Sequence, residues 1–449
     1  MSDLLALGLS GLTAYRTALA AVGENVANAE TPGYARRTVR LEPALGGASS
    51  DPIYRDNFTF GGVSAAAVVR AWDDFRAAET RHAAAAAGRG GVREQWFTGI
   101  ETMLDDSAAG IGSRITSFFN AGDALAAAPG DTLNRSRMLM ALEDVSGAFR
   151  TTTEGLGRIA GGITQGAALD VTRLNDALVA LADTNRTLLT AGAGGTGRAS
   201  LEDQRDRLID TIAASVDVNV TLAPNGTATL ALADAPGSTL VGGGDVARFA
   251  VTSAADGRLS VQVTNASGTT AFTPLTGRLA GYVEASAATA DRRAALDTLA
   301  ADFAAEINAW SAAGRDSSGT PGQQLLSVTT GAASMRALVS DPALVPAASA
   351  DGRPNGNLLA LAPLRGPSGA ERRWTGIVAG HAQQLAAAKS EHAAAQAWRE
   401  NSFAALDETT GIDLDREAAD LLRFQQAYSA ATRIIQVGRE TFNDLLSAF

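Results

Sequence analysis

Large apolar side chains recur every seven positions at both ends of the chain, which is the spacing of one seam of a packed helix. The amino-terminal set is Leu5, Leu12, Leu19 and Val26, with Gly8, Tyr15 and Val22 three positions after the first three. The carboxy-terminal set is Leu414, Leu421, Tyr428, Ile435 and Phe442. A single stripe of this kind most often packs on its own domain core, but two matching seams favour pairing of the terminal helices. Isolated helices are marginal in water, so we expect both ends to be loosely ordered until a partner buries them.

Helical spacing also dominates much of the chain between these ends. It covers residues 64 to about 110 and 113 to 190, with predicted breaks near 88–91 and 128–131. A glycine-rich loop follows, and Ser200 is expected to cap the next helix with its side-chain oxygen.

A different period marks the segment from Val216 to about Val283. Apolar and polar residues alternate in VDVNVTL, TATLAL and RLSVQVT, and PNG, DAPGS and NASG supply turns. This pattern predicts a small antiparallel β domain between two helical halves. Helical spacing then resumes, and the last two helices are predicted at 371–408 and 413–447, with a break at Gly411.

The predicted fold is therefore mainly α-helical, with an inserted small antiparallel β domain and terminal helices that pair as a coiled-coil-like inner domain. Residues 1–45 with 409–449 form the predicted terminal-helix domain, 46–215 with 285–408 the long-helix domain, and 216–284 the β-rich outer domain.

A proline–glycine turn ends the first helix in the stretch VANAETPGYARRTVRL, residues 26–41. Pro32 disfavours a helical conformation at Thr31, and Pro32 with Gly33 suits a type II turn in which Gly33 takes a positive φ. Asn28 is expected to bond to local backbone at the break. From Tyr34 onward the residues alternate as in an extended arm. An ordinary helix–turn–strand connection would have the same local geometry.

Composition narrows the function classes. The chain has 449 residues, is 46% hydrophobic but only 5% aromatic, and carries a formal net charge of −11. Without a dense run of lysine or arginine, the charge distribution speaks against nucleic-acid binding. Cysteine is absent, which excludes disulfides and thiolate metal sites.

Targeting signals are weak in this sequence. Asp3 stands where a secretory signal would be positively charged, so we expect no cleavable signal. We expect no window to reach the roughly 20 apolar residues of a membrane span, and therefore expect no membrane insertion.

Candidate chemistry is sparse as well. Residues 192–197 match G-x-G-x-x-G but follow a predicted helix rather than a strand, which favours a plain loop. His82, His381 and His392 have no partner at metal-ligand spacing. Acidic pairs such as Asp73 with Asp74 point in different directions on a helix. We therefore expect no catalytic, metal or cofactor site, and no enzyme.

Two terminal motifs resemble those of the bacterial flagellar axial proteins, the group of rod, hook and hook-associated proteins. They are NVANAETPGYARR (25–37) and TTGIDLDREAADLLRFQQAYSAATRIIQVGRETFNDLL (409–446). The second is most similar to the first hook-associated proteins, and residues 61–81, 201–210 and 299–319 agree with the same group. The chain departs from the family pattern at Glu30, Asp413 and Arg416, and we expect residues 320–340 to run through without the inserted domain of larger members.

The resemblance implies a structural protein of the flagellum. Such proteins leave the cell through the flagellar type III export channel without signal cleavage and form a ring of subunits between hook and filament. Their partners are further copies of themselves, the hook protein, the second junction protein next to the filament, and an export chaperone that holds the carboxy-terminal helix. By this analogy the chaperone would contact Leu421, Tyr428, Ile435 and Phe442.

Two alternatives stay open. A hook or rod protein would have similar ends, although the long helical middle and the FQQAYSAATRII segment argue against it. A wall-cutting flagellar enzyme would need a catalytic carboxylate in a cleft, and the sequence offers no candidate.

Overall fold

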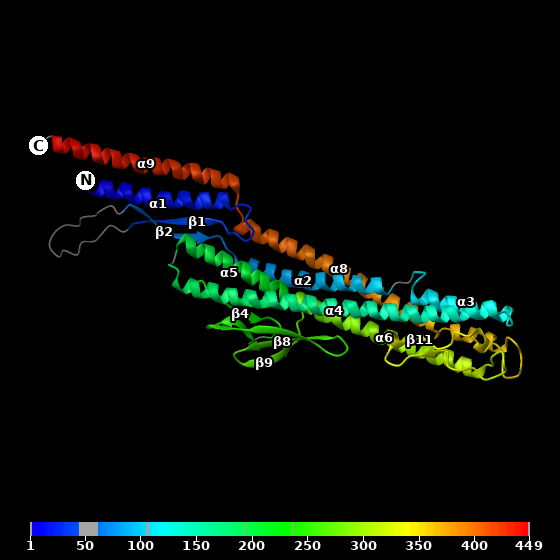
Figure 1. The fold of residues 1–449 in the computed structure, drawn as a ribbon. Coiled ribbons are helices and arrows are strands. Elements are labelled where there is room, and N and C mark those ends of the chain that lie inside the picture. Colours follow the sequence, from blue (N-terminus) through cyan, green and yellow to red (C-terminus); the bar gives the residue numbers. More distant parts are fainter. Residues whose placement is uncertain (1, 45–61, 105–106, 193, 236, 448–449) are drawn as a thin grey trace.

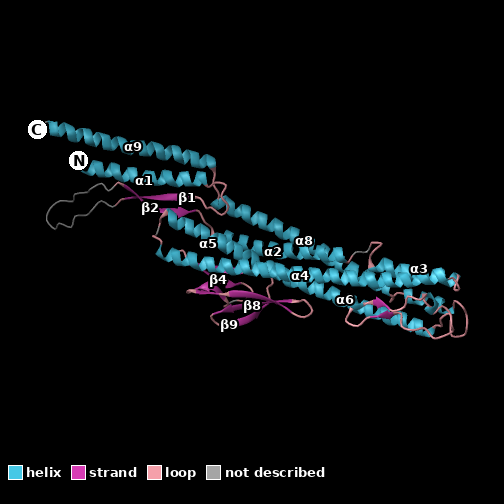
Figure 2. Cartoon of the chain, viewed as in Figure 1, coloured by secondary structure: helices cyan, strands magenta, loops and turns pink. Residues whose placement is uncertain are grey.

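The computed structural model describes residues 2–44, 62–104, 107–192, 194–235 and 237–447. Figure 1 shows an elongated molecule in which a long helical bundle forms the body and two paired helices with a β-hairpin form a layer at one end. Small sheets lie along one side of the bundle (Figure 2). We call the layer at the end the terminal layer.

Six helices build the bundle: α2 (Asp74–Met103), α3 (Ile111–Ala127), α4 (Thr132–Thr190), α5 (Thr196–Ser215), α6 (Gly277–Ala313) and α8 (Ala370–Thr410). Helix α2 packs on α8 and α6, while α4 packs on α3, α5 and α6. Side chains of Asp73 and Asp131 accept hydrogen bonds from the first free backbone N–H groups of α2 and α4, which defines where these helices begin. One continuous hydrophobic core runs through the bundle, from Val92 to Ala388.

Two antiparallel sheets lie on α4 and α6. One contains β3 (Val218–Leu222), β4 (Ala228–Leu232), β5 (Thr239–Gly242) and β6 (Asp245–Val246), and the other β7 (Arg248–Ser253), β8 (Leu259–Asn265) and β9 (Gly268–Phe272). Two asparagines of α4 fix them. Asn185 bonds to both the N–H and the C=O of Ala228 at 2.9 and 2.8 Å, and Asn175 does the same for Phe249 at 2.8 and 2.9 Å.

Short elements cover the far end of the bundle. They are β10 (Leu326–Ser327), η1 (Ala332–Ser334), β11 (Arg336–Ala337), η2 (Pro342–Leu344), α7 (Gly356–Leu359) and η3 (Ala362–Arg365). Buried Asn357 ties this region to α6, because its side chain donates to the carbonyl of Trp310 at 3.1 Å and its carbonyl accepts from the Trp310 indole at 2.6 Å.

The terminal layer consists of α1 (Ser2–Ala27), β1 (Arg37–Pro43), β2 (Val63–Arg70) and α9 (Leu414–Ser447). Strands β1 and β2 pair antiparallel, and α1 packs on this hairpin as well as on α9. Both terminal helices point away from the bundle (Figure 1).

The predicted fold class is confirmed: the chain is mainly helical, carries antiparallel sheets between helical halves, and pairs its terminal helices. The predicted breaks near 128–131 and at Gly411 are also found.

Three local predictions are wrong. Residues 63–70 form strand β2 rather than helix, because short alanine–valine runs suit either structure and pairing with β1 decides. Helix α2 continues through 88–91, where glycine permits close packing: a Cβ at Gly90 would lie 2.9 Å from the Cα of His392. Ser200 lies inside α5, whose N-cap is Gly195. In addition, α6 begins at Gly277, so the end of the segment expected to be β is helical.

The expectation about membrane-spanning segments also needs correction. Within the described residues, the helical stretch Leu4–Ala27 is long and apolar enough to cross a membrane by length and composition, with a mean hydropathy of 1.3. A core helix of a soluble protein can pass the same test, and α1 packs on α9 and on the β1–β2 hairpin.

His381 of α8 gives the bundle a sensitivity to acid. It is buried against α2, and its Nε2 donates to the carbonyl oxygen of Phe97 at 2.8 Å. Nδ1 therefore holds the lone pair, and it has no hydrogen-bond partner among the described residues. Burial is the main cause that lowers the pKa of His381, and the hydrogen bond to Phe97 opposes this effect.

Replacing His381 by Gln keeps an N–H donor and removes the titration. Because the folded-state pKa lies below the unfolded one, the stability tied to the neutral ring is complete above about pH 6.5 and is lost as the pH falls. The free energy of unfolding should therefore drop more in the wild-type chain than in His381→Gln between about pH 7.5 and 5. Urea unfolding at both pH values checks this, and equal drops would contradict it.

Candidate functional site at the terminal helices

Small residues bring α1 and α9 close together. A Cβ at Gly8 would lie 2.6 Å from Cγ1 of Ile435, and one at Gly11 would lie 3.3 Å from the Cβ of Ala431. On the facing helix, a Cβ at Gly438 would lie 3.3 Å from Cδ2 of Leu5. Since a side chain at Gly8 has no room, the pairing of these helices depends on glycine there.

The structure places the predicted seam residues in two groups. Leu5, Leu12, Leu19, Leu421, Tyr428 and Ile435 are half-buried, whereas Val26, Leu414 and Phe442 are 46%, 55% and 49% exposed. The last three lie outside the contact of α1 with α9 within this chain, and their place in an assembly seam stays a prediction. The buried side of α1 is instead lined by the small residues Gly8, Gly11, Ala14, Ala18 and Ala21, of which Gly8 and Gly11 lie against Ile435 and Ala431 of α9. Helix α1 must face both α9 and the hairpin, and small residues allow this.

The partner expected for each terminal helix lies within the same chain, since α1 and α9 pack on each other. The four residues assigned by analogy to chaperone binding lie on α9. Leu421, Tyr428 and Ile435 are half-buried where α9 packs on α1, whereas Phe442 is exposed.

Apolar residues remain exposed on the outer faces of both helices. On α1 these include Leu4 and Leu9, and on α9 they include Leu422, Ile434 and Val437. Arg16 is the one charged residue of α1 between Leu4 and Gly23. The paired helices therefore still present apolar surface that no described part of the chain covers.

The turn after α1 has the predicted geometry. Gly33 has a φ of 73°, and the N–H of Tyr34 donates to the carbonyl of Thr31 at 3.2 Å, which closes the turn around Pro32. The Asn28 side chain donates to the carbonyl of Glu24 at 2.9 Å, and its oxygen lies 3.3 Å from the hydroxyl of Thr31. This turn sends the chain back along α1 as strand β1.

A buried polar pair joins α1 to α9 at the end nearest the bundle. Asn25 and Glu417 are both 0% exposed, and the Asn25 amide donates to the Glu417 carboxylate at 3.0 Å and to the carbonyl of Arg37 at 2.8 Å. The oxygen of Asn25 accepts from the N–H of Arg37 and the hydroxyl of Tyr34 at 2.9 and 3.0 Å. Arg36 completes the group, because its Nε donates to Glu417 at 2.6 Å. Every polar atom of Asn25 thus has a partner.

A second buried cluster joins the hairpin to α5 of the bundle. Arg37 of β1 and Arg70 of β2 both reach Asp203, at 2.9 and 2.8 Å. Arg70 also donates to Asp206 at 3.0 Å, and Arg205 binds the same carboxylate with Nη2 at 2.9 and 3.0 Å. All five side chains are at most 6% exposed. We call this set the junction cluster.

Aromatic rings and burial add to the cluster. The guanidinium of Arg37 stacks over Tyr34 at 4.6 Å, and that of Arg70 over Trp72 at 4.8 Å. Burial lowers the pKa of Arg37, but hydrogen bonds to Asp203 and Glu24 more than offset this and the net pKa is raised. Burial also raises the pKa of Tyr34 to about 12, which keeps its hydroxyl protonated as the donor to Asn25.

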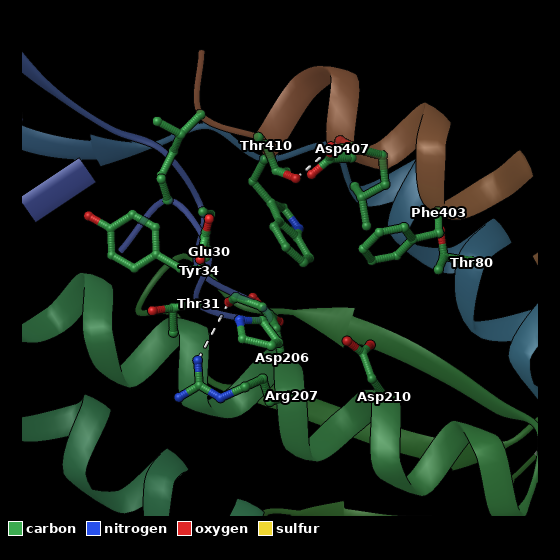
Figure 3. Close-up of a pocket in the computed structure, with 18 residues that line it drawn as sticks. Glu30, Thr31, Tyr34, Thr80, Asp206, Arg207, Asp210, Phe403, Asp407 and Thr410 are labelled. Atoms are coloured by element: carbon green, nitrogen blue, oxygen red, sulfur yellow. Dashed lines mark hydrogen bonds between the residues drawn. The ribbon is translucent and has the colours of Figure 1, made fainter. Parts of the chain in front are cut away.

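A cavity of about 280 Å³ lies where the terminal layer bends into the bundle (Figure 3). Its walls come from the turn at 29–35, from α5, and from the end of α8 with Gly411 and Ile412. Figure 3 shows Asp407 and Phe403 of α8 on one side and Asp206, Arg207 and Asp210 of α5 on the other. We call this place the elbow.

Sequence reasoning found the helices and the turn but missed the junction cluster. Arg37, Arg70, Asp203 and Asp206 lie far apart in the chain, and no spacing rule connects them. Asn25 could have been identified from the sequence, because a polar residue next to an apolar seam often specifies which helices pair and in which register.

Changing Asp203 to Asn should destabilise the chain by about 3 kcal/mol, since Arg37 and Arg70 would keep buried charges with fewer partners. Asp176→Asn on the exposed face of α4 is the matched control, with an expected change within about 0.5 kcal/mol. Chemical unfolding measures both. Equal stability of the two variants would show that the cluster contributes nothing.

Comparison with known proteins adds independent information. The profile of the family described as flagellar hook-associated protein FlgK helical domain matches residues 97–326, and that of the flagella basal body rod protein matches residues 5–34. Flagellar hook-associated protein 1 of Salmonella typhimurium is 28% identical over 337 residues, which is 73% of this chain and 60% of the relative. The same protein of Bacillus subtilis is 28% identical over 229 residues, 50% of this chain and 45% of the relative. The chain thus spans less than two thirds of these relatives. The structure of the flagellar hook junction protein FlgK from Burkholderia pseudomallei superimposes with a TM-score of 0.49 at 21% identity, over 56% of this chain and 47% of that chain.

Proposed function

The chain belongs to the family of the flagellar hook-associated protein FlgK, and on this basis we propose that it is a structural axial protein of the bacterial flagellum at the hook–filament junction. It acts by assembly rather than by catalysis. Further copies of the chain, the hook protein and the second junction protein next to the filament are its proposed partners. It needs no cofactor in this role.

One observation carries the proposal: α1 and α9 pair through small residues and still expose apolar side chains on their outer faces. Leu9 of α1 and Val437 of α9 are examples. Burying such a face against neighbouring copies stabilises by about 25 cal/mol per Å² of apolar surface. A ring of paired helices buries these faces in every subunit, which a single copy cannot do.

Export adds a second requirement. Exposed apolar stripes on a subunit in the cytoplasm favour aggregation, which a chaperone that binds α9 prevents. Because α1 covers Leu421, Tyr428 and Ile435 in the folded chain, a chaperone that contacts this stripe must displace α1. Chaperone binding and pairing of the terminal helices then exclude each other. We propose export through the flagellar type III channel without cleavage.

A hook or rod protein is the second candidate, and the match of residues 5–34 to the rod-protein family favours it. That match covers the shared terminal motif only. The match over residues 97–326 belongs to the helical domain of the hook-associated family, and it supports the junction role over the alternative.

The experiment is to replace Gly8 by Val in cells that otherwise lack this chain. A side chain at Gly8 collides with Ile435, so the helices separate and the cells should make hooks without filaments and release flagellin into the medium. Gly157→Val is the matched control, because no atom lies within 4 Å of the added Cβ on α4, and filaments should form normally. Normal filaments with Gly8→Val, at equal protein level, would contradict the proposed assembly.

A further inference from the structure

A groove at the elbow extends the cavity of Figure 3 along α8. The cavity of about 280 Å³ and a neighbouring one of about 430 Å³ share Thr80, Asp210 and Phe403 as lining residues. Helix α5 and the beginning of α2 form one wall of this groove, and α8 forms the other. Phe403 is 60% exposed between the two cavities, in a chain with few aromatic residues.

The groove combines apolar surface with an excess of carboxylates. Glu30, Glu400 and Asp407 line it and form no ion pair among the described residues, and Arg207 and Arg399 are its unpaired cations. Asp210 is already paired with Arg81 at 2.8 Å. The unpaired groups therefore sum to one excess negative charge next to an exposed ring. A planar cation attached to an apolar helix face complements this combination.

The outer face of α9 offers such a group. Ile434 and Val437 are exposed there, and Arg433 beside them is exposed and has no ion-pair partner in the described part of the chain. A cation that binds this groove from a second copy is expected to be arginine, since Lys389 is the one lysine among the 37 lysine and arginine residues. Its guanidinium bonds to carboxylates with two N–H groups and stacks on aromatic rings.

These two surfaces cannot meet within one chain. Helix α9 begins next to the elbow and runs straight away from it (Figure 1). At a rise of 1.5 Å per residue, Arg433 lies about 30 Å from the elbow of its own chain. Contact requires a second copy displaced by about this distance along α9.

We propose that the elbow groove of one copy receives Arg433 and Val437 from α9 of a neighbouring copy, with Asp407 as the ionic partner and Phe403 as the apolar one. This inference rests on the proposed function, because it names the surfaces through which adjacent subunits of the ring meet beyond their terminal helices. The charge excess and the exposed ring at the elbow would then be buried only in the assembled ring.

Cross-linking tests the contact directly, since the chain has no cysteine of its own. Leu406→Cys lies in the groove between Phe403 and Asp407, and Gln436→Cys lies on the exposed face of α9 between Arg433 and Val437. Flagella from cells that produce the double variant, treated with copper phenanthroline and oxygen, should yield covalently linked chains. Thr298→Cys on α6 replaces Leu406→Cys in the control and should yield none. Absence of linked chains from the first pair, or equal yields from both, would overturn the proposal.

Charge reversal provides the second test. Asp407→Arg and Arg433→Asp should each lower the cross-linking yield by about tenfold through repulsion, and the combination of both should restore it. Asp176→Arg on α4 is the matched control and should leave it unchanged. If Asp407→Arg acts but Arg433→Asp does not, the groove has another occupant and the proposal fails. If all these variants form normal filaments while Gly8→Val does not, the elbow contact is wrong and the proposed function stands.

Discussion

The buried contact between the hairpin arginines and the carboxylates of α5 is the interaction on which the terminal layer depends. The buried guanidinium groups of Arg37 and Arg70 are removed from water, and the carboxylates of Asp203 and Asp206 provide the interactions that water would otherwise make. Arg37 is the first residue of β1, which follows the turn after α1, and Arg70 is the last residue of β2, which precedes the connection to α2. One ionic contact therefore fixes both strands of the hairpin on the bundle.

The terminal helices are held in a different way from the bundle. Large apolar side chains fill the core of the bundle, whereas in the contact of α1 with α9 glycine on one helix lies against side chains such as Leu5 or Ile435 on the other. Such a contact is close but buries little apolar area per residue. The buried polar pair of Asn25 and Glu417 and the packing of α1 on the hairpin therefore also stabilise the terminal layer. The arrangement leaves apolar side chains on the outside of both helices, which is consistent with a part that is completed by neighbouring copies.

The elements with strong local signals could be predicted from the sequence. Pro32 and Gly33 fix the turn by their backbone restrictions, and the long helices follow from periodicity. Strand β2 could not be predicted, because its alanines and valines suit a helix equally well until β1 pairs with it. The heptad rule put Val26 and Leu414 in the seam, but the face of a helix that packs on two neighbours is set by the tertiary structure. The junction cluster joins charges from distant segments, and charged residues in a single sequence usually indicate a solvated surface.

The terminal layer is folded onto the bundle in the single chain, before any assembly. Hydrogen exchange of the purified monomer tests this most directly, because amides in α1, β1 and α9 report on the layer while amides in α4 report on the bundle. We expect protection in α1, in β1 and in the part of α9 that faces α1, and loss of that protection in Asp203→Asn while α4 stays protected. Exchange of α1 and α9 at the rate of an unfolded chain, with α4 protected, would contradict this expectation.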